Sequence, residues 1–191
     1  MRKSWVLITI ALLWSGLALA EEGEMALLHA GADIRNTDSL QRGARNFMNY
    51  CSGCHSLQYL RYNRMAEDLE IPESELAANL MFTTGKAADT INSAMPKDAE
   101  SWFGKQPPDL SLMARARSVD YIYSFLKGFY VDKTRPWGVN NLYLPGAAMP
   151  DVLAGIQGLQ KPVFKNEPDA GGSARMVRVG VDSMSAGSFN P

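Results

Sequence analysis

The pattern of apolar and polar positions predicts short helices separated by long irregular segments. A first helix is expected to end near Cys51, with Thr37 or Asp38 capping its start. Its apolar positions follow helical spacing and form one face: Leu40, Ala44, Phe47, Met48 and Cys51. A second helix is predicted from Pro72 to Leu80, where acidic side chains in the first turn suit the helix dipole.

Two more helices are predicted in the second half of the chain. Asp109 is expected to cap a short helix that runs through Arg117, and Asp120 to cap the next one. The apolar residues of the latter lie at helical spacing: Ile122, Phe125, Leu126 and Phe129. Residues 95–108 and 134–146 are rich in loop-forming residues, and 176–181 alternate as in a short strand. The expected fold class is mainly α, with long irregular loops.

The N-terminus has the three parts of a secretory signal peptide. Arg2 and Lys3 are followed by an apolar run and by an A-x-A cleavage site that ends at Ala20. The apolar run is shorter than the roughly 20 residues of a spanning helix. We therefore expect residues 1–20 to be removed on export and residues 21–191 to form one domain.

The charge of the chain does not favour binding to nucleic acid or to an anionic membrane surface. The sequence has 19 basic and 20 acidic residues, and removal of Arg2 and Lys3 leaves 17 against 20. This small negative balance permits a basic protein partner.

The two cysteines of the chain both lie in the motif Cys51-Ser52-Gly53-Cys54-His55. A C-x-x-C-H motif is typical of c-type haem attachment, in which two thiols form thioethers and the histidine is an axial ligand. A structural zinc site would need a fourth ligand, such as His29 or a carboxylate. A thioredoxin-like pair would need a βαβ context that the pattern does not suggest, and one cysteine pair does not make a disulfide scaffold.

The second axial ligand must come from another part of the chain. His29 precedes the attachment helix and is expected to be a surface or packing residue. Two methionines are followed by proline, Met95 and Met149, and proline stiffens such a loop. Met149 lies farther from His55 and is preferred on that ground, with Met95 as the alternative.

Two arginines on the predicted helix, Arg115 and Arg117, are candidates to pair with the haem propionates. Residues two apart on a helix point to nearly opposite sides, so one would face the haem and the other water. Both would be solvated surface charges if neither pairs with a propionate.

Several motifs in order resemble the cytochrome c1 family, the haem subunit of the bacterial cytochrome bc1 complex. They run from about Leu40 to Met149 and comprise Arg42-Gly43-Ala44, the haem motif through Leu57, Pro107-Pro108-Asp109-Leu110-Ser111, Arg115-Ala116-Arg117, Asp120 to Leu126, Asn141 to Gly146, and Ala148-Met149-Pro150. The C-x-x-C-H motif alone indicates only a haem, whereas this ordered set is specific to the family.

The resemblance implies a cytochrome c-like domain with one covalently attached haem c. Cys51 and Cys54 would carry the thioether bonds, and His55 and Met149 would be the axial ligands. Arg117 corresponds to the family's propionate-binding arginine, and Tyr121 would lie near the same edge. The protein would act within a complex with cytochrome b and the Rieske iron–sulfur protein, and would not be an enzyme on its own. It would pass one electron from the Rieske protein to a soluble cytochrome c on the periplasmic side of the bacterial inner membrane.

One departure from the family concerns the C-terminus. Family members continue into a further helix and a transmembrane anchor, which this sequence does not show before Pro191. We expect a truncated chain, held at the membrane through its complex, which would be soluble in the periplasm if it truly ends at Pro191. The alternatives are a free periplasmic c-type cytochrome and, less compatible with a sixth ligand, a haem enzyme such as a peroxidase.

Overall fold

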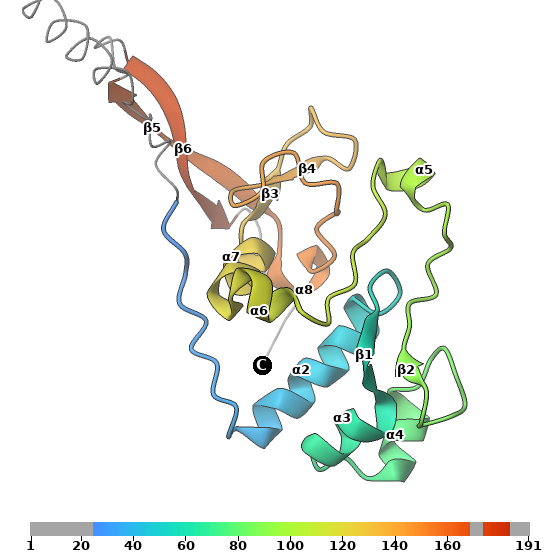
Figure 1. Cartoon of the computed structure of the whole chain (residues 1–191). Coiled ribbons are helices and arrows are strands. Elements are labelled where there is room, and N and C mark those ends of the chain that lie inside the picture. Colours follow the sequence, from blue (N-terminus) through green and yellow to red (C-terminus); the bar gives the residue numbers. More distant parts are fainter. Residues whose placement is uncertain (1–24, 169–173, 184–191) are drawn as a thin grey trace, which may run out of the picture.

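The computed structural model describes residues 25–168 and 174–183, so the predicted signal peptide lies outside the described residues. Figure 1 shows two groups of elements, connected by a long segment that carries α5. The described helices are α2 (Thr37–Tyr50), α3 (Tyr62–Asp68), α4 (Glu73–Asn79), α5 (Glu100–Phe103), α6 (Met113–Arg117), α7 (Val119–Lys127) and α8 (Ala154–Gln157).

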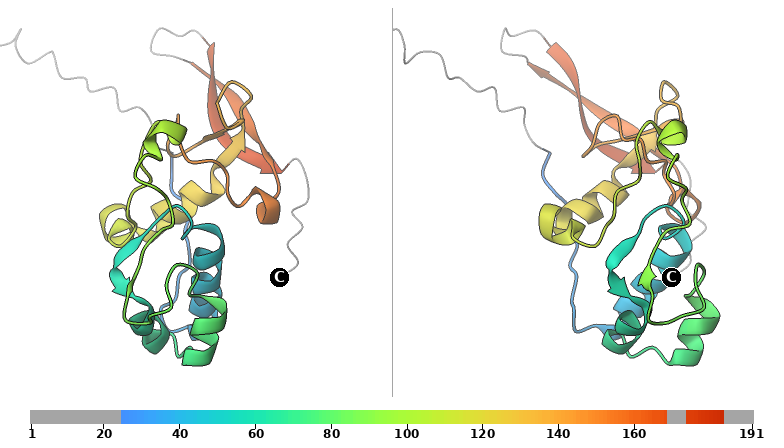
Figure 2. Two further views of the ribbon diagram at one scale, coloured as in Figure 1. Left: turned by 90° about the vertical axis from the view of Figure 1, so that its right-hand side faces the viewer. Right: turned by 45° about the vertical axis from the view of Figure 1, so that its right-hand side comes forward.

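The strands of the described residues form three separate antiparallel pairs. β1 (Leu57–Arg61) pairs with β2 (Thr90–Ile91), and β3 (Phe129–Val131) pairs with β4 (Val139–Asn141). β5 (Gln160–Pro168) pairs with β6 (Ala174–Ser183) in a hairpin that extends away from the helices in Figures 1 and 2. The prediction of a mainly α fold is thus confirmed only in part, because these strand pairs make up a substantial share of the described structure.

The first group of elements packs α2, α3 and α4 around one hydrophobic core. Tyr62, Leu76 and Ile91 are almost completely buried there, and Met48 of α2 is 2% exposed. Each of these side chains comes from a different element, so burial of their apolar surface holds the two-stranded sheet against the helices. The core therefore fixes the direction of α2, which leads into the haem motif.

The second group of elements is built on α7, β3 and β4. The Phe125 and Phe129 rings meet edge to face, with their centroids 5.1 Å apart. The N-terminal segment runs along α7, because the Leu28 N–H donates to the Ser124 hydroxyl (2.8 Å) and the Ala30 N–H to the Asp120 carboxylate (2.8 Å). Ser124 is fully buried under this segment.

The helix positions were predicted better than the residues that cap them. Asn36 caps α2, in place of Thr37 or Asp38, since its side chain accepts the Ser39 N–H (3.0 Å). Ser118 caps α7 by accepting the Tyr121 N–H (3.1 Å), whereas Asp120 binds the Ala30 N–H. The helix predicted from Asp109 begins only at Met113, and no side chain caps it.

Other corrections concern the predicted loops and one helix face. The loop expected over 95–108 contains α5, and the irregular segment 134–146 contains β4. Phe129, expected on the apolar face of the last helix, lies in β3 because α7 ends at Lys127 and Gly128 follows as its C-cap. The strand predicted over 176–181 is confirmed within β6.

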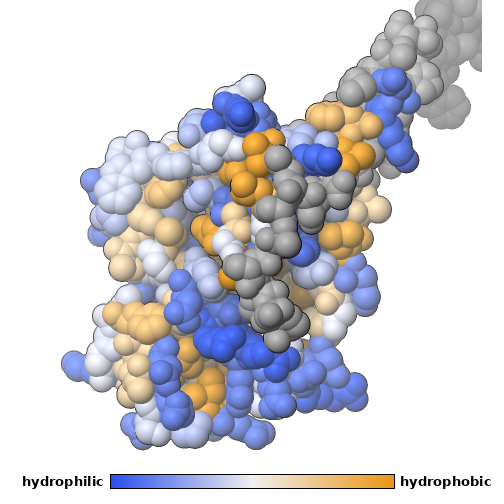
Figure 3. All heavy atoms as spheres, turned by 180° about the vertical axis from the view of Figure 1, so that it is seen from behind, coloured by the Kyte–Doolittle hydropathy of each residue, from blue (hydrophilic) through white to orange (hydrophobic). Residues whose placement is uncertain are grey.

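The surface carries apolar and polar residues interspersed. Seen from behind, apolar residues lie in several separate groups among hydrophilic ones (Figure 3). Within the part of the chain that the structure describes, none of the helices has the length and apolar composition that crossing a bilayer requires.

Candidate haem site

The haem motif forms one helical turn at the end of α2. The Cys51 N–H donates to the Phe47 carbonyl (2.9 Å), and the His55 N–H donates to the Cys51 carbonyl (2.8 Å). Residues three and four positions apart in such a turn lie on the same side. The turn therefore brings Cys51, Cys54 and His55 together on one side, as attachment of a single haem requires.

The two thiols do not have the lowered pKa of a reactive thioredoxin-like pair. Both cysteines are free and half-buried. Burial raises the pKa of the Cys51 thiol, and the nearby Cys54 raises it further. Burial also raises the pKa of the Cys54 thiol. A thioredoxin-like pair instead needs a thiol whose pKa is lowered. The described residues contain no group of three or more His, Cys, Asp or Glu that could hold a metal ion.

His55 is oriented by a backbone carbonyl that is distant in sequence. Its Nδ1 lies 2.7 Å from the Pro108 oxygen. A carbonyl only accepts hydrogen bonds, so the proton of the neutral ring is on Nδ1 and Nε2 keeps its lone pair. A hydrogen bond from the ring nitrogen that does not bind the metal to a backbone carbonyl is typical of metal-binding histidines. The donor set of the motif therefore fits a haem iron.

Asp109 holds the Pro108 carbonyl in place beside His55. Its carboxylate accepts the N–H of Gln58 (2.9 Å) and the N–H of Ser111 (2.9 Å), which ties residues 108–111 to β1. Burial acts to raise the pKa of Asp109, but the hydrogen bonds from Ser111 and Gln58 and the nearby His55 hold this pKa below its ordinary value. The Leu110 N–H also donates to the Ser56 carbonyl (2.9 Å).

The two candidate methionines lie on different loops. Met149 is half-buried on the loop between β4 and α8, and Met95 is half-buried on the loop after β2. Figures 1 and 2 agree in placing α8 beside the end of α2 that leads into the haem motif. Met149 thus follows β4 of the second group of elements, and Met95 follows β2 of the first.

Arg117 and Tyr121 are brought together at the junction of α6 and α7. The Arg117 guanidinium carbon lies 5.4 Å from the centroid of the Tyr121 ring, in a cation–π arrangement. Arg115 and Arg117 are both exposed on α6. His29 is also at the surface, with its Nδ1 3.5 Å from the Asp120 carboxylate.

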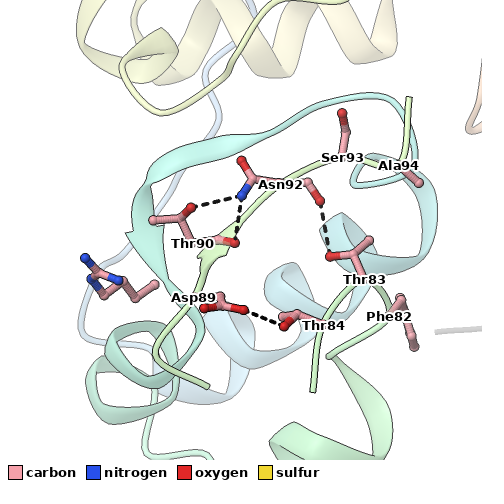
Figure 4. A pocket seen from close by; sticks show the side chains of 9 residues that line it. Phe82, Thr83, Thr84, Asp89, Thr90, Asn92, Ser93 and Ala94 are labelled. Carbon is pink, nitrogen blue, oxygen red and sulfur yellow. Dashed lines mark hydrogen bonds between the residues drawn. The ribbon is translucent and has the colours of Figure 1, made fainter. Parts of the chain in front are cut away.

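A pocket of about 730 Å³ lies beside β1 and β2 (Figure 4). Its lining is mostly polar. Figure 4 shows Asn92 hydrogen-bonded to Thr83 and Thr90, and Thr84 donating separately to Asp89. None of the residues predicted from the sequence to bind haem lines this pocket. Ligand sites for a large apolar ring are lined mainly by apolar side chains, so this pocket is not the haem site.

Sequence reasoning missed the polar residues that hold these groups in place. Pro108 contributes only a backbone carbonyl, which no side-chain pattern reveals. Asn141 is completely buried, and Asn140 and Arg135 bind the loop that precedes Met149. Asn141 did lie in one of the family-like motifs, but no sequence pattern indicated that it or its neighbours would hold this loop.

Comparison with known proteins identifies the family. The Cytochrome C1 family profile matches residues 32–158. Cytochrome c1 of Allochromatium vinosum is 48% identical over 100% of this chain and 78% of its own length. The ammonia monooxygenase gamma subunit of Nitrosomonas europaea is 41% identical over 84% of this chain and 68% of its own. Cytochrome c1 of Rhodospirillum rubrum is 31% identical over 64% of this chain and 57% of its own length. The chain therefore belongs to the cytochrome c1 family, a c-type cytochrome of the bc1 complex, and its one C-x-x-C-H motif carries a single covalent haem c.

Proposed function

We propose that this chain accepts one electron from the Rieske iron–sulfur protein and passes it to a soluble cytochrome c. The proposed axial ligands are His55 and Met149, and the proposed thioether residues are Cys51 and Cys54. The observation that carries this proposal is the 2.7 Å contact between His55 Nδ1 and the Pro108 oxygen. This contact places the proton of the neutral ring on Nδ1, so the lone pair of Nε2 is available to bind the iron.

The haem, when bound, supplies the one-electron chemistry, and the protein contributes ligation, burial and orientation. Ligation by histidine and methionine raises the reduction potential, which suits an acceptor downstream of a Rieske centre. Pro150 restricts Met149 to extended backbone conformations, which limits the ways in which its side chain can move away. A stable sixth ligand of this kind suits a protein that carries electrons rather than one that binds substrate at iron.

Arg117 is proposed to pair with the haem propionates. The ring of Tyr121 supports its guanidinium at 5.4 Å, which restricts the side chain although it is exposed. A guanidinium held in this way can bind a carboxylate through two parallel hydrogen bonds. We place Tyr121 at the same edge of the haem, through its contact with Arg117.

The complex would lie on the periplasmic side of the bacterial inner membrane, with cytochrome b and the Rieske protein as partners. Co-purification tests this assembly: the tagged chain should bring down both partners from detergent-solubilised membranes. Isolation of the chain without either partner would favour the free periplasmic cytochrome instead.

The ligand assignment is tested by replacing each methionine in the haem-loaded protein. Met149→Leu should remove the sulfur-to-iron absorption band of the oxidised state and lower the reduction potential. Met95→Leu should leave both nearly unchanged. The opposite pattern would assign the sixth ligand to Met95.

A further inference from the structure

The loop that precedes Met149 is held at Gly146, where two side chains bind the backbone N–H and the backbone carbonyl. The Gly146 N–H donates to the Asn140 side-chain oxygen (2.8 Å), and the Gly146 carbonyl accepts from Arg135 Nη2 (3.0 Å). Gly146 has a φ of 79°, in the left-handed region that favours glycine. Its conformation is thus set by two side chains of the β3–β4 hairpin, three residues before Met149.

The same loop is tied to α7 through Asn141, which is completely buried. Its Nδ2 donates to the Phe125 carbonyl (2.7 Å), and its side-chain oxygen accepts the N–H groups of Tyr143 (2.9 Å) and Leu144 (3.2 Å). A buried carboxamide that uses both its donor and its acceptor in this way rigidifies the backbone around it. The start of the loop is therefore fixed to the helix that carries Tyr121.

The two groups that hold Gly146 are themselves supported by Asp132. The Asn140 Nδ2 donates to the Asp132 carboxylate (3.0 Å), and Thr134 binds the other oxygen of this carboxylate through its N–H (3.0 Å) and its hydroxyl (2.6 Å). The Arg135 N–H donates to the Asp132 carbonyl (3.1 Å). Arg135 Nε is buried and has no hydrogen-bond partner among the described residues. The hydrogen bond from Arg135 Nη2 to the Gly146 carbonyl therefore offsets part of the cost of burying this guanidinium.

We propose that Arg135 and Asn140 are positioning residues, which hold the Gly146 turn so that Met149 stays directed at the iron. This inference rests on the proposed function, because it takes Met149 as the sixth ligand. Neither side chain has to touch the haem. Loss of either contact would let the loop open, and the methionine would leave the iron more often.

Imidazole binding to the oxidised, haem-loaded chain measures this opening. Imidazole can occupy the sixth position only when the methionine has left it, so the apparent affinity reports the population of the open loop. Arg135→Ala and Asn140→Ala should each raise the apparent imidazole affinity, by about tenfold, and weaken the sulfur-to-iron band. Arg135→Lys keeps a cationic donor, so its imidazole affinity should lie between those of the wild type and Arg135→Ala. This variant also provides the measurement if Arg135→Ala does not take up haem.

Matched controls separate positioning from general stability. Arg35→Gln and Asn166→Ala alter exposed residues outside the loop and should keep the wild-type affinity and band. Met149→Leu should lose the band and bind imidazole most tightly. If Met149→Leu keeps the band, the ligand assignment fails. If it loses the band while both alanine variants keep wild-type imidazole affinity, the positioning role alone is wrong.

Discussion

Replacement of Asp109 by alanine should weaken both the fold and the environment of His55. The carboxylate accepts two backbone N–H groups, from Gln58 and Ser111, at 2.9 Å each. A hydrogen bond contributes roughly 0.5–1.5 kcal/mol to stability, and partial exposure of Asp109 favours the low end of this range. Asp109→Ala should therefore lower the free energy of unfolding by about 1–2 kcal/mol.

A second effect should follow at the haem. Asp109 holds the segment whose Pro108 carbonyl accepts from His55 Nδ1, and such outer hydrogen bonds set the orientation and basicity of a metal-binding histidine. Asp109→Ala should therefore also shift the reduction potential. Asp109→Asn retains one carbonyl oxygen for one of the two N–H groups, so we expect an intermediate loss of stability.

Urea unfolding of the haem-loaded protein, followed by its absorption, gives the free energy, and a redox titration gives the potential. Asp68→Ala is the matched control, because it removes only an exposed i,i+4 ion pair with Arg64 and should change both quantities little. Wild-type stability of Asp109→Ala would contradict the contribution of its two hydrogen bonds. An unchanged potential in Asp109→Ala, or an equal shift in Asp68→Ala, would show that Asp109 does not act on His55 through Pro108.

Two further predictions concern charged groups. Arg117→Gln should shift the reduction potential or weaken haem-pocket stability more than Arg115→Gln does, because it is Arg117 that lies over the Tyr121 ring. A redox titration and urea unfolding measure these effects. Equal and negligible effects of the two substitutions would show that both arginines are solvated surface charges. The N–H of Ala30 is the main cause that holds the pKa of Asp120 below its ordinary value. The ionised Asp120 therefore stabilises the fold above about pH 4, which is roughly the pKa of an aspartate in the unfolded chain. This stabilisation is lost as the pH falls through the pKa of Asp120 in the folded protein. Urea midpoints should accordingly fall less steeply with acid in Asp120→Asn than in wild type, and parallel curves would contradict this.

The part of the site that could be predicted from the sequence is the part that is local in the chain. Cys51, Cys54 and His55 lie within five residues, so their spacing alone places them on one side of a turn. Arg117 and Tyr121 are four residues apart, and they do meet although they belong to two short helices. In both cases the distance along the chain limits how far the side chains can separate.

The parts that could not be predicted depend on partners far away in sequence. Asp109 and Asp120 have the usual chemistry of helix caps, yet their carboxylates bind the N–H groups of Gln58 and Ala30, which come from other segments. Local propensity gives no information on such competition. Similarly, Thr90–Ile91 is too short to show a strand period and exists as a strand only through its pairing with β1.

Gly128 shows how a single close contact redirects the chain. A side-chain carbon at this residue would lie 2.7 Å from the Tyr143 ring and 2.9 Å from the Ser124 carbonyl, closer than real contacts allow. The glycine lets Tyr143 approach the end of α7, and the Leu142 N–H donates to the Gly128 carbonyl (3.0 Å). Phe129 consequently enters β3 instead of continuing the apolar face of the helix.

The residues proposed on the two sides of the haem are connected by one continuous path through segment 107–128. Near its start, Pro108 accepts from His55 and Leu110 donates to Ser56, which fixes this segment to the haem motif. Its helices carry Arg117 and Tyr121, and near its end the Phe125 carbonyl accepts from Asn141 in the loop that leads to Met149. Rigid hydrogen-bonded elements transmit small displacements rather than absorbing them. The orientation of His55 and that of Met149 should therefore depend on each other through the backbone of this segment, even though the two side chains come from different groups of elements.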